Sequence, residues 1–94
     1  MTKIVRHCLV SGIVQGVFYR QNTMQQALQY HITGWVKNLA DGRVEAILIG
    51  TEESVLSMLE WMAVGPEKAV VTSLEVSDPT DVNIEAYKDF EIIR

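Results

Sequence analysis

The sequence has few of the features that mark several large classes of protein. Its one cysteine, Cys8, has no partner for an internal disulfide, and its Cys and His residues do not have the spacing of a zinc site. No apolar run reaches the ~18 residues of a membrane span, and the N-terminal residues 1–4 lack the apolar region of a signal peptide. We therefore expect a protein of the cytoplasm with no disulfide, no metal site and no membrane partner.

Basic residues are also scarce. Eight Lys and Arg stand against twelve Asp and Glu, which gives a net charge of −4. Proteins that bind nucleic acid draw much of their affinity from neutralising phosphates, so this charge argues against a nucleic-acid partner. Only two Pro and six Gly occur among 94 residues, of which 48% are hydrophobic, and this excludes collagen-like and disordered chains. The length suits a single domain over residues 1–94, and we expect a monomer.

Hydrophobic patterning predicts five strands and two helices. In chain order we expect a strand over 3–11, a loop over 12–20, a helix over 21–30, strands over 34–39 and 44–49, a helix over 52–64, a strand over 69–76, an acidic surface loop over 77–89 and a strand over 90–93. The apolar stripe of the first helix is expected at Met24, Ala27, Leu28 and His31, and that of the second at Val55, Met58, Leu59 and Met62.

Local chemistry supports several of these boundaries. Asp41-Gly42 suits the tight turn of a hairpin between the two central strands. Thr51 can cap the N-terminus of the second helix, and Gly65-Pro66 stops that helix. The order β-α-β-β-α-β with a short fifth strand predicts a ferredoxin-like α+β sandwich, in which two helices pack on one face of an antiparallel sheet. This fold hosts many unrelated functions, so it does not by itself indicate one.

The loop between the first strand and the first helix is the best candidate for a binding site. Gly16 allows a close approach of the backbone to a ligand, and the amides that follow it lead into the positive end of a helix. Arg20 adds a planar, permanently charged group that suits phosphate oxygens. The local pattern matches neither a P-loop nor a dinucleotide fingerprint, so an ordinary glycine-containing turn remains an alternative.

The sequence allows two different roles for each of two further polar residues. Asn38 at a strand end is suited to positioning water with its amide, or else it only caps the hairpin turn. Thr23 either supports the loop before the first helix by hydrogen bonding or only satisfies a free amide. Cys8 is expected in the core, and His7 and His31 have no third ligand for a metal.

Two segments taken together carry a resemblance to a known family. Residues 12–20, GIVQGVFYR, and residues 34–38, GWVKN, followed by Asp41-Gly42 and Val44-Glu45, resemble the two signature blocks of the acylphosphatase family. The similarity continues through Gly65-Pro66 to Phe90 and Ile92, and so covers essentially the whole chain. It implies the same ferredoxin-like fold that the order of elements predicts.

The resemblance also implies a function and the residues that perform it. The substrate class is acyl phosphates, which are hydrolysed to a carboxylate and inorganic phosphate, and the phosphate inhibits as product. The backbone amides of a phosphate loop are expected to hold the phosphate, and this loop comprises Gln15, Gly16, Val17, Phe18, Tyr19 and Arg20. The Arg20 side chain is expected to bind phosphate oxygens and Asn38 to orient the attacking water. The resemblance implies no metal and no organic cofactor.

One position departs from the family pattern. His31 follows the first helix where the family usually has Gly, which predicts a left-handed conformation at a modest cost in stability.

Two other functions remain as alternatives. One alternative is a non-catalytic module that binds carbamoyl phosphate, as in larger carbamoyl-transfer proteins. The other is an RNA-recognition domain, although the strand over 44–49 has no aromatic pair for stacking bases.

Overall fold

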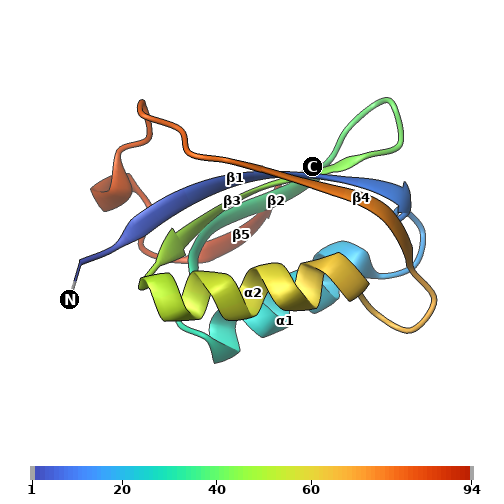
Figure 1. Ribbon diagram of the computed structural model, residues 1–94, viewed down its shortest axis with the longest axis horizontal. Coiled ribbons are helices and arrows are strands. Elements are labelled where there is room, and N and C mark those ends of the chain that lie inside the picture. The colour runs from blue at the N-terminus through green and yellow to red at the C-terminus, as the bar shows by residue number, and fades with distance from the viewer. Residues whose placement is uncertain (1, 94) are drawn as a thin grey trace.

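The structure, a computed structural model, describes residues 2–93 as one layer of sheet and one layer of helices (Figure 1). In chain order the elements are β1 (Ile4–Ile13), α1 (Tyr19–Gln29), β2 (Thr33–Asn38), β3 (Val44–Gly50), α2 (Glu52–Val64), β4 (Val70–Ser77), a 3-10 helix (Ile84–Ala86) and β5 (Phe90–Ile93). Both helices lie on the same side of the sheet (Figure 1). The prediction of a ferredoxin-like sandwich is thereby confirmed.

The sheet has the strand order β4-β1-β3-β2-β5. The four longer strands pair antiparallel, as predicted, whereas β5 pairs parallel with β2 from Gly34 opposite Phe90 onward. The sheet is therefore mixed rather than wholly antiparallel. The connection between β4 and β5 explains this direction. β4 runs opposite to β2, so its last residue lies at the same side of the sheet as the first residue of β2. The segment after β4 crosses to the other edge on that side, and β5 therefore starts beside the start of β2 and runs parallel to it.

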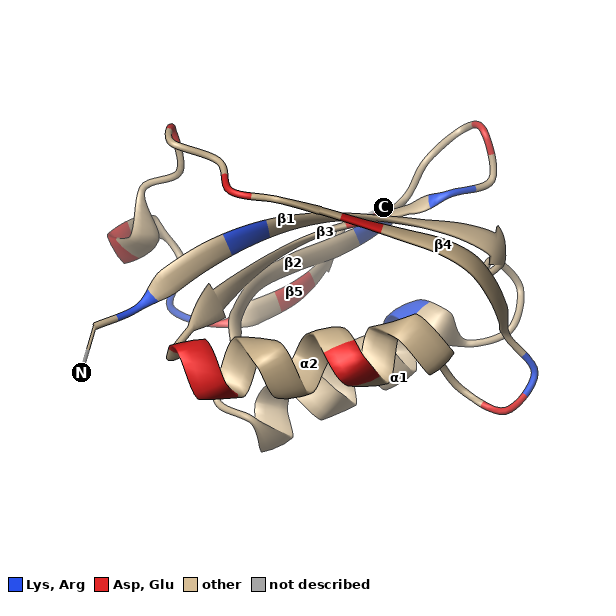
Figure 2. Cartoon of the chain, in the orientation of Figure 1, with Lys and Arg blue, Asp and Glu red and all other residues tan. Residues whose placement is uncertain are grey.

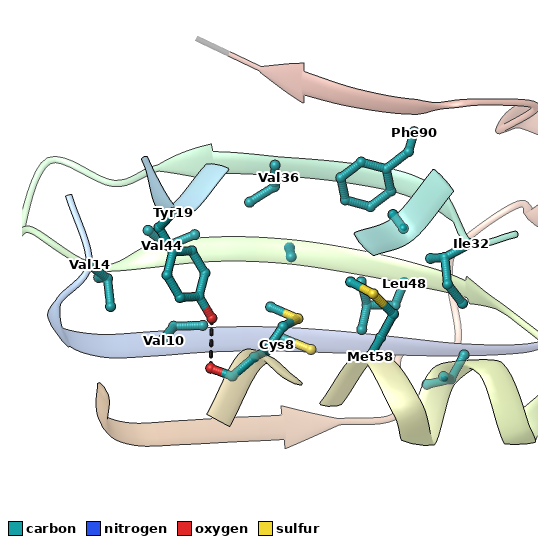
Figure 3. Packing of buried hydrophobic residues seen from close by; sticks show 14 residues of the cluster. Cys8, Val10, Val14, Tyr19, Ile32, Val36, Val44, Leu48, Met58 and Phe90 are labelled. Atoms are coloured by element: carbon teal, nitrogen blue, oxygen red, sulfur yellow. Dashed lines mark hydrogen bonds between the residues drawn. The ribbon is translucent and has the colours of Figure 1, made fainter. Parts of the chain in front are cut away.

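The main core lies between the helices and the sheet (Figure 3). Val55, Met58 and Met62 of α2 are fully buried, in agreement with the predicted stripe. Cys8 is also fully buried, and burial raises the pKa of its thiol to about 12. The prediction that Cys8 is a packing residue agrees with both observations.

The buried side of α1 differs from the predicted stripe. Its buried residues are Tyr19, Thr23 and Ala27, whereas Leu28 is 58% exposed and His31 is exposed. The helix begins at Tyr19, two residues earlier than predicted, and this aromatic residue enters the core at its first turn. A stripe that starts from Tyr19 continues at four-residue spacing and leaves Leu28 on the outer side.

Capping interactions of nearby residues define the start of α2 and the end of α1. The Thr51 side chain accepts a hydrogen bond from the Ser54 amide at 3.2 Å, which confirms the predicted N-cap of α2. His31 has a φ of 59°, which confirms the predicted left-handed conformation after α1. The Ile32 amide donates to the Ala27 carbonyl at 2.8 Å, as in a Schellman motif.

The segment after β4, which the sequence predicts to be a surface loop, also packs against the sheet. Val82, Ile84 and Tyr87 pack with Trp35 against a second cluster on the face of the sheet opposite the helices. That cluster is formed by Val5, Ile47 and Ile49. The strands thus carry apolar residues on both faces of the sheet. The helices cover one face, and the segment after β4 covers part of the other. No helix among residues 2–93 has the length and apolar character needed to span a membrane.

Candidate active site

The loop between β1 and α1 owes its shape to two residues with positive φ. Gly16 has a φ of 76° and Phe18 a φ of 61°. A Cβ at Gly16 would meet no atom within 4 Å, so its backbone conformation, rather than a lack of space, requires glycine there. Alternation of left-handed with other conformations is typical of backbone segments whose amides converge on an anion.

The N-terminus of α1 has no side-chain cap. Phe18 occupies the N-cap position without a side-chain hydrogen bond, and the first turn contains no acidic residue. The first α-helical hydrogen bond joins the Asn22 amide to the Phe18 carbonyl at 3.1 Å, so the amides of residues 19–21 precede it. In α2, by contrast, Thr51 caps the N-terminus and Glu52 and Glu53 lie in the first turn. The positive end of α1 is therefore the one that favours an anionic ligand.

Arg20 lies in the first turn of α1 and lines a pocket at the loop, and it differs from two other arginines, Arg6 and Arg43, in its ion pairing. Arg6 pairs with Asp78 at 3.1 Å and Arg43 pairs with Asp41 at 2.8 Å. Within residues 2–93, the half-buried Arg20 side chain has neither an ion pair nor a hydrogen bond to the protein. Its guanidinium group thus keeps all its donors for a ligand.

Asn38 meets the phosphate loop from the end of β2. A pocket of about 160 Å³ is lined by Asn38 together with Val14, Gln15, Gly16, Phe18, Tyr19, Arg20 and Gln21. This volume is several times the ~30 Å³ that one water molecule occupies in the liquid, so it can hold a phosphate group and a water. The two sequence blocks, separate in the chain, thus form one pocket.

The Asn38 side chain is not used in closing the hairpin. Its Oδ1 atom is buried and has no hydrogen-bond partner among the described residues. The turn is instead held by the Leu39 amide, which donates to the Arg43 carbonyl at 2.8 Å, and by the Asp41 carboxylate, which accepts from the Arg43 amide at 3.1 Å. The alternative that Asn38 only caps the turn therefore finds no support, and Asn38 is one of the residues that line the pocket.

The loop side chains divide between pocket and core. Val17 is half-buried against the main core and does not line the pocket with Asn38. The Tyr19 ring is buried, and its hydroxyl donates to the Met62 carbonyl at 2.8 Å, which appears as a dashed line in Figure 3. Burial, reinforced by Cys8, raises the pKa of Tyr19 above its ordinary value. If these two residues bind phosphate, they do so through their backbone amides.

Gln15 makes contacts that the sequence analysis missed. Its Nε2 atom donates to the Leu39 carbonyl at 2.8 Å and to the Arg43 carbonyl at 2.9 Å. The side chain therefore ties the phosphate loop to the β2–β3 hairpin directly beside Asn38. Gln21 also lines the pocket and was missed; its place in the first turn of α1 was the available signal.

The Thr23 contact agrees with the first of its two predicted roles. Its hydroxyl donates to the Tyr19 carbonyl at 2.7 Å, within α1. Because Tyr19 is both a residue of the phosphate loop and the first residue of α1, this bond ties the end of the loop to the helix, and the hydroxyl does not serve a free amide. His7 and His31 also lie apart: the His7 Nε2 atom is 2.7 Å from the Glu45 carboxylate, and His31 is exposed at the end of α1. Across residues 2–93, no three His, Cys, Asp or Glu residues are placed to hold a metal ion.

Basic residues do not gather into a patch. Figure 2 shows them dispersed over strands, turns and the start of α1. A dispersed arrangement does not favour the RNA-recognition alternative, which needs a basic surface next to stacking aromatic residues.

Comparisons with known proteins show the family to which the chain belongs. The family model described as acylphosphatase matches residues 6–92. A relative from Syntrophus aciditrophicus named acylphosphatase is 41% identical over 87 residues, which are 93% of this chain and 88% of the relative. The solved structure of an acylphosphatase from Coxiella burnetii has a TM-score of 0.89 and 35% identity, covering 97% of this chain and 93% of its own. An acylphosphatase structure from Bacillus subtilis has a TM-score of 0.89 and 32% identity, covering 97% and 99%. The chain belongs to the acylphosphatase family and is an enzyme that hydrolyses acyl phosphates.

Proposed function

We propose that hydrolysis takes place in the pocket between the phosphate loop and Asn38. The observation that carries this proposal is that one pocket is lined both by the uncapped, positive end of α1 and by Asn38, whose Oδ1 atom has no hydrogen-bond partner among the described residues. One suits the phosphate of the substrate and the other suits a hydrogen-bond donor such as water.

The phosphate group binds at the loop. Backbone amides of residues 15–20 donate to its oxygens, and Arg20 adds a charged, bidentate contact. These donors are positioned before the substrate arrives, because Tyr19 is anchored in the core and Gln15 is tied to the hairpin. They stabilise the charge on the transferring group in the transition state, which is the main requirement of phosphoryl transfer.

Asn38 positions the attacking water. Its side-chain amide makes a hydrogen bond to the water, whose oxygen attacks phosphorus. The bond between phosphorus and the acyl oxygen breaks, and its electron pair leaves with the carboxylate. Tyr19 and Arg20 are the titratable residues that line the pocket, and the Tyr19 hydroxyl is bound to a carbonyl. The proton of the water therefore passes to an oxygen of the phosphate itself.

The remaining expectations concern the setting of the reaction. We propose a cytoplasmic monomer that works without metal or organic cofactor and is inhibited competitively by inorganic phosphate. The inhibitor occupies the phosphate loop in the same way as the phosphate group of the substrate.

The test is hydrolysis of benzoyl phosphate in buffer treated with chelator, by wild type, Arg20→Ala and Asn38→Ala. We expect each variant to lose roughly 10²–10³-fold in kcat, the usual effect of removing one preorganised donor. Arg6→Ala is the matched control, because Arg6 pairs with Asp78 away from the pocket, and it keeps its activity. Normal turnover in folded Arg20→Ala contradicts the assignment. Phosphate binding without turnover by wild type supports the binding-module alternative.

A further inference from the structure

The phosphate pocket leaves open where the acyl group of the substrate lies. Its volume of about 160 Å³ and its lining of loop and helix-end residues suit the phosphate and the water. The acyl group therefore has to extend beyond it. In phosphoryl transfer the attacking and leaving oxygens lie roughly in line, so the acyl group leaves on the side opposite the water and Asn38.

A second pocket lies on the other side of Phe18. Its volume is about 300 Å³, and its lining residues are Val17, Phe18, Asn22, Pro66, Glu67 and Lys68. Phe18 lines both pockets, so they adjoin at this residue. The second pocket is built from the phosphate loop, the first turn of α1 and the turn between α2 and β4. It contains no residue of β2, so it lies away from Asn38.

Phe18 is an unusual residue for its position. Its side chain is 69% exposed although the residue is large and apolar, and its φ of 61° is one that non-glycine residues rarely adopt. The Asn22 side chain helps to hold this conformation by donating to the Phe18 carbonyl at 2.9 Å. An exposed aromatic ring held in a strained backbone conformation beside a reaction site is typical of a functional contact rather than of packing.

The lining of the second pocket favours an apolar ligand. Val17, Phe18 and Pro66 present apolar surface, while the opposite charges of Glu67 and Lys68 leave no net charge to select an ion. We propose that the acyl group of the substrate lies in this pocket against the ring of Phe18, and that aromatic and other large apolar acyl groups are preferred over small ones. This inference rests on the proposed phosphate site.

The first test compares two substrates in the same protein. The quantity measured is the ratio of kcat/KM for benzoyl phosphate to kcat/KM for acetyl phosphate. We expect Phe18→Gly and Phe18→Asn to lower this ratio roughly tenfold, the lower end of the discrimination that apolar contacts provide. Both replacements suit a left-handed conformation, so they preserve the loop amides. Because each ratio is taken within one protein, a general loss of activity cancels out.

Leu28→Asn is the matched control. Leu28 is an exposed apolar residue of the same helix, and it does not line either pocket. Its variant keeps the wild-type ratio. A ratio unchanged in both Phe18 variants overturns the inference while leaving the proposed function intact. Failure of wild type to hydrolyse either substrate overturns both.

A second measurement needs no variant. Benzoylphosphonate and acetylphosphonate carry a carbon–phosphorus bond in place of the scissile bond, and both are titrated into wild-type protein. We expect benzoylphosphonate to bind more tightly and to shift the NMR amide signals of Glu67 and Lys68, which inorganic phosphate leaves in place. Equal affinities with no shift in the amide signals of Glu67 and Lys68 place the acyl group elsewhere and contradict the inference.

Discussion

At the scale of single residues, the phosphate loop uses its side chains mainly to position its backbone. Tyr19 is buried and bonds to α2, and Val17 packs against the core. Gln15 donates two hydrogen bonds to the hairpin that carries Asn38. Arg20 is the side chain with donors left for a ligand. The loop therefore resembles a backbone cradle whose shape is set by contacts with three neighbouring elements.

Replacing Gln15 with Ala tests this view. The variant loses two hydrogen bonds, each worth about 0.5–1.5 kcal/mol, and so lowers the free energy of unfolding in urea. It also loosens the distance between the loop and Asn38, and a misplacement of about 1 Å is enough to lower kcat up to 10²-fold. We expect kcat to fall more than KM rises, because the loop amides still bind phosphate. Gln25→Ala, at an exposed position of α1, is the control. Equal effects of both substitutions on kcat contradict a positioning role for Gln15.

At the scale of elements, the two helices differ in how their N-termini are satisfied. α2 is capped by Thr51 and carries Glu52 and Glu53 in its first turn, whereas α1 has neither kind of group. The difference is functional on our proposal, because the ligand takes the place of the cap in α1. On this proposal, helix capping distinguishes α2, which supports the fold, from α1, which binds the substrate.

Inorganic phosphate should therefore stabilise the protein through α1. At 100 times its Kd a ligand that binds only the folded state adds ~2.7 kcal/mol, which corresponds to a rise in Tm on the order of 10 °C for a domain of this size. We expect this rise in wild type and in Thr51→Ala, although Thr51→Ala starts from a lower Tm because it loses about 1 kcal/mol of capping. Arg20→Ala loses most of the rise. Thermal unfolding with and without phosphate measures both effects, and an equal rise in Arg20→Ala contradicts the site.

The C-terminal end of α1 carries a separate cost. His31 adopts a φ of 59°, in which a side chain is less favourable than glycine. We expect His31→Gly to raise Tm by a few degrees, since the relief of about 1 kcal/mol exceeds the added flexibility of the unfolded chain. kcat stays unchanged, because His31 lies at the end of the helix away from the phosphate loop. His31→Ala, which keeps the strain, gives no such rise. A lower Tm for His31→Gly means that the imidazole stabilises the turn.

At the scale of the whole molecule, the main core closes one face of the sheet, and the segment over residues 78–89 covers part of the other. Cys8 lies in the middle of β1 and is fully buried in the main core. Its thiol has a pKa raised to about 12 by burial, and the thiolate is the form that reacts with alkylating agents. The thiol is thus both inaccessible and protonated at neutral pH in the folded state.

Cys8 therefore reports global unfolding. We expect iodoacetamide to label the native protein only as fast as the whole domain opens, and labelling to accelerate in urea in parallel with the loss of structure measured by circular dichroism. Phosphate slows labelling, because it stabilises the folded state. Fast labelling of the native protein without denaturant contradicts the burial of β1 in a cooperative core.

The sequence by itself determined the features that depend on neighbours in the chain. The hairpin at Asp41-Gly42 and the cap at Thr51 follow from turn and capping chemistry that acts over a few residues. The left-handed conformation of His31 follows from its place after the first helix, where the family usually has Gly. The two signature blocks indicated the family, which the comparisons confirm, and they predict its site residues, because each block is contiguous in the chain.

Only the tertiary structure decided the features that depend on contacts between distant segments. Tyr19, the first residue of α1, is buried and donates a hydrogen bond to the distant Met62 carbonyl, and the parallel direction of β5 depends on where β4 ends. The clamp from Gln15 to the hairpin and the second pocket beside Phe18 bring together residues more than 20 positions apart. Patterning over a short window contains no information on such pairs, because packing of the whole chain selects them.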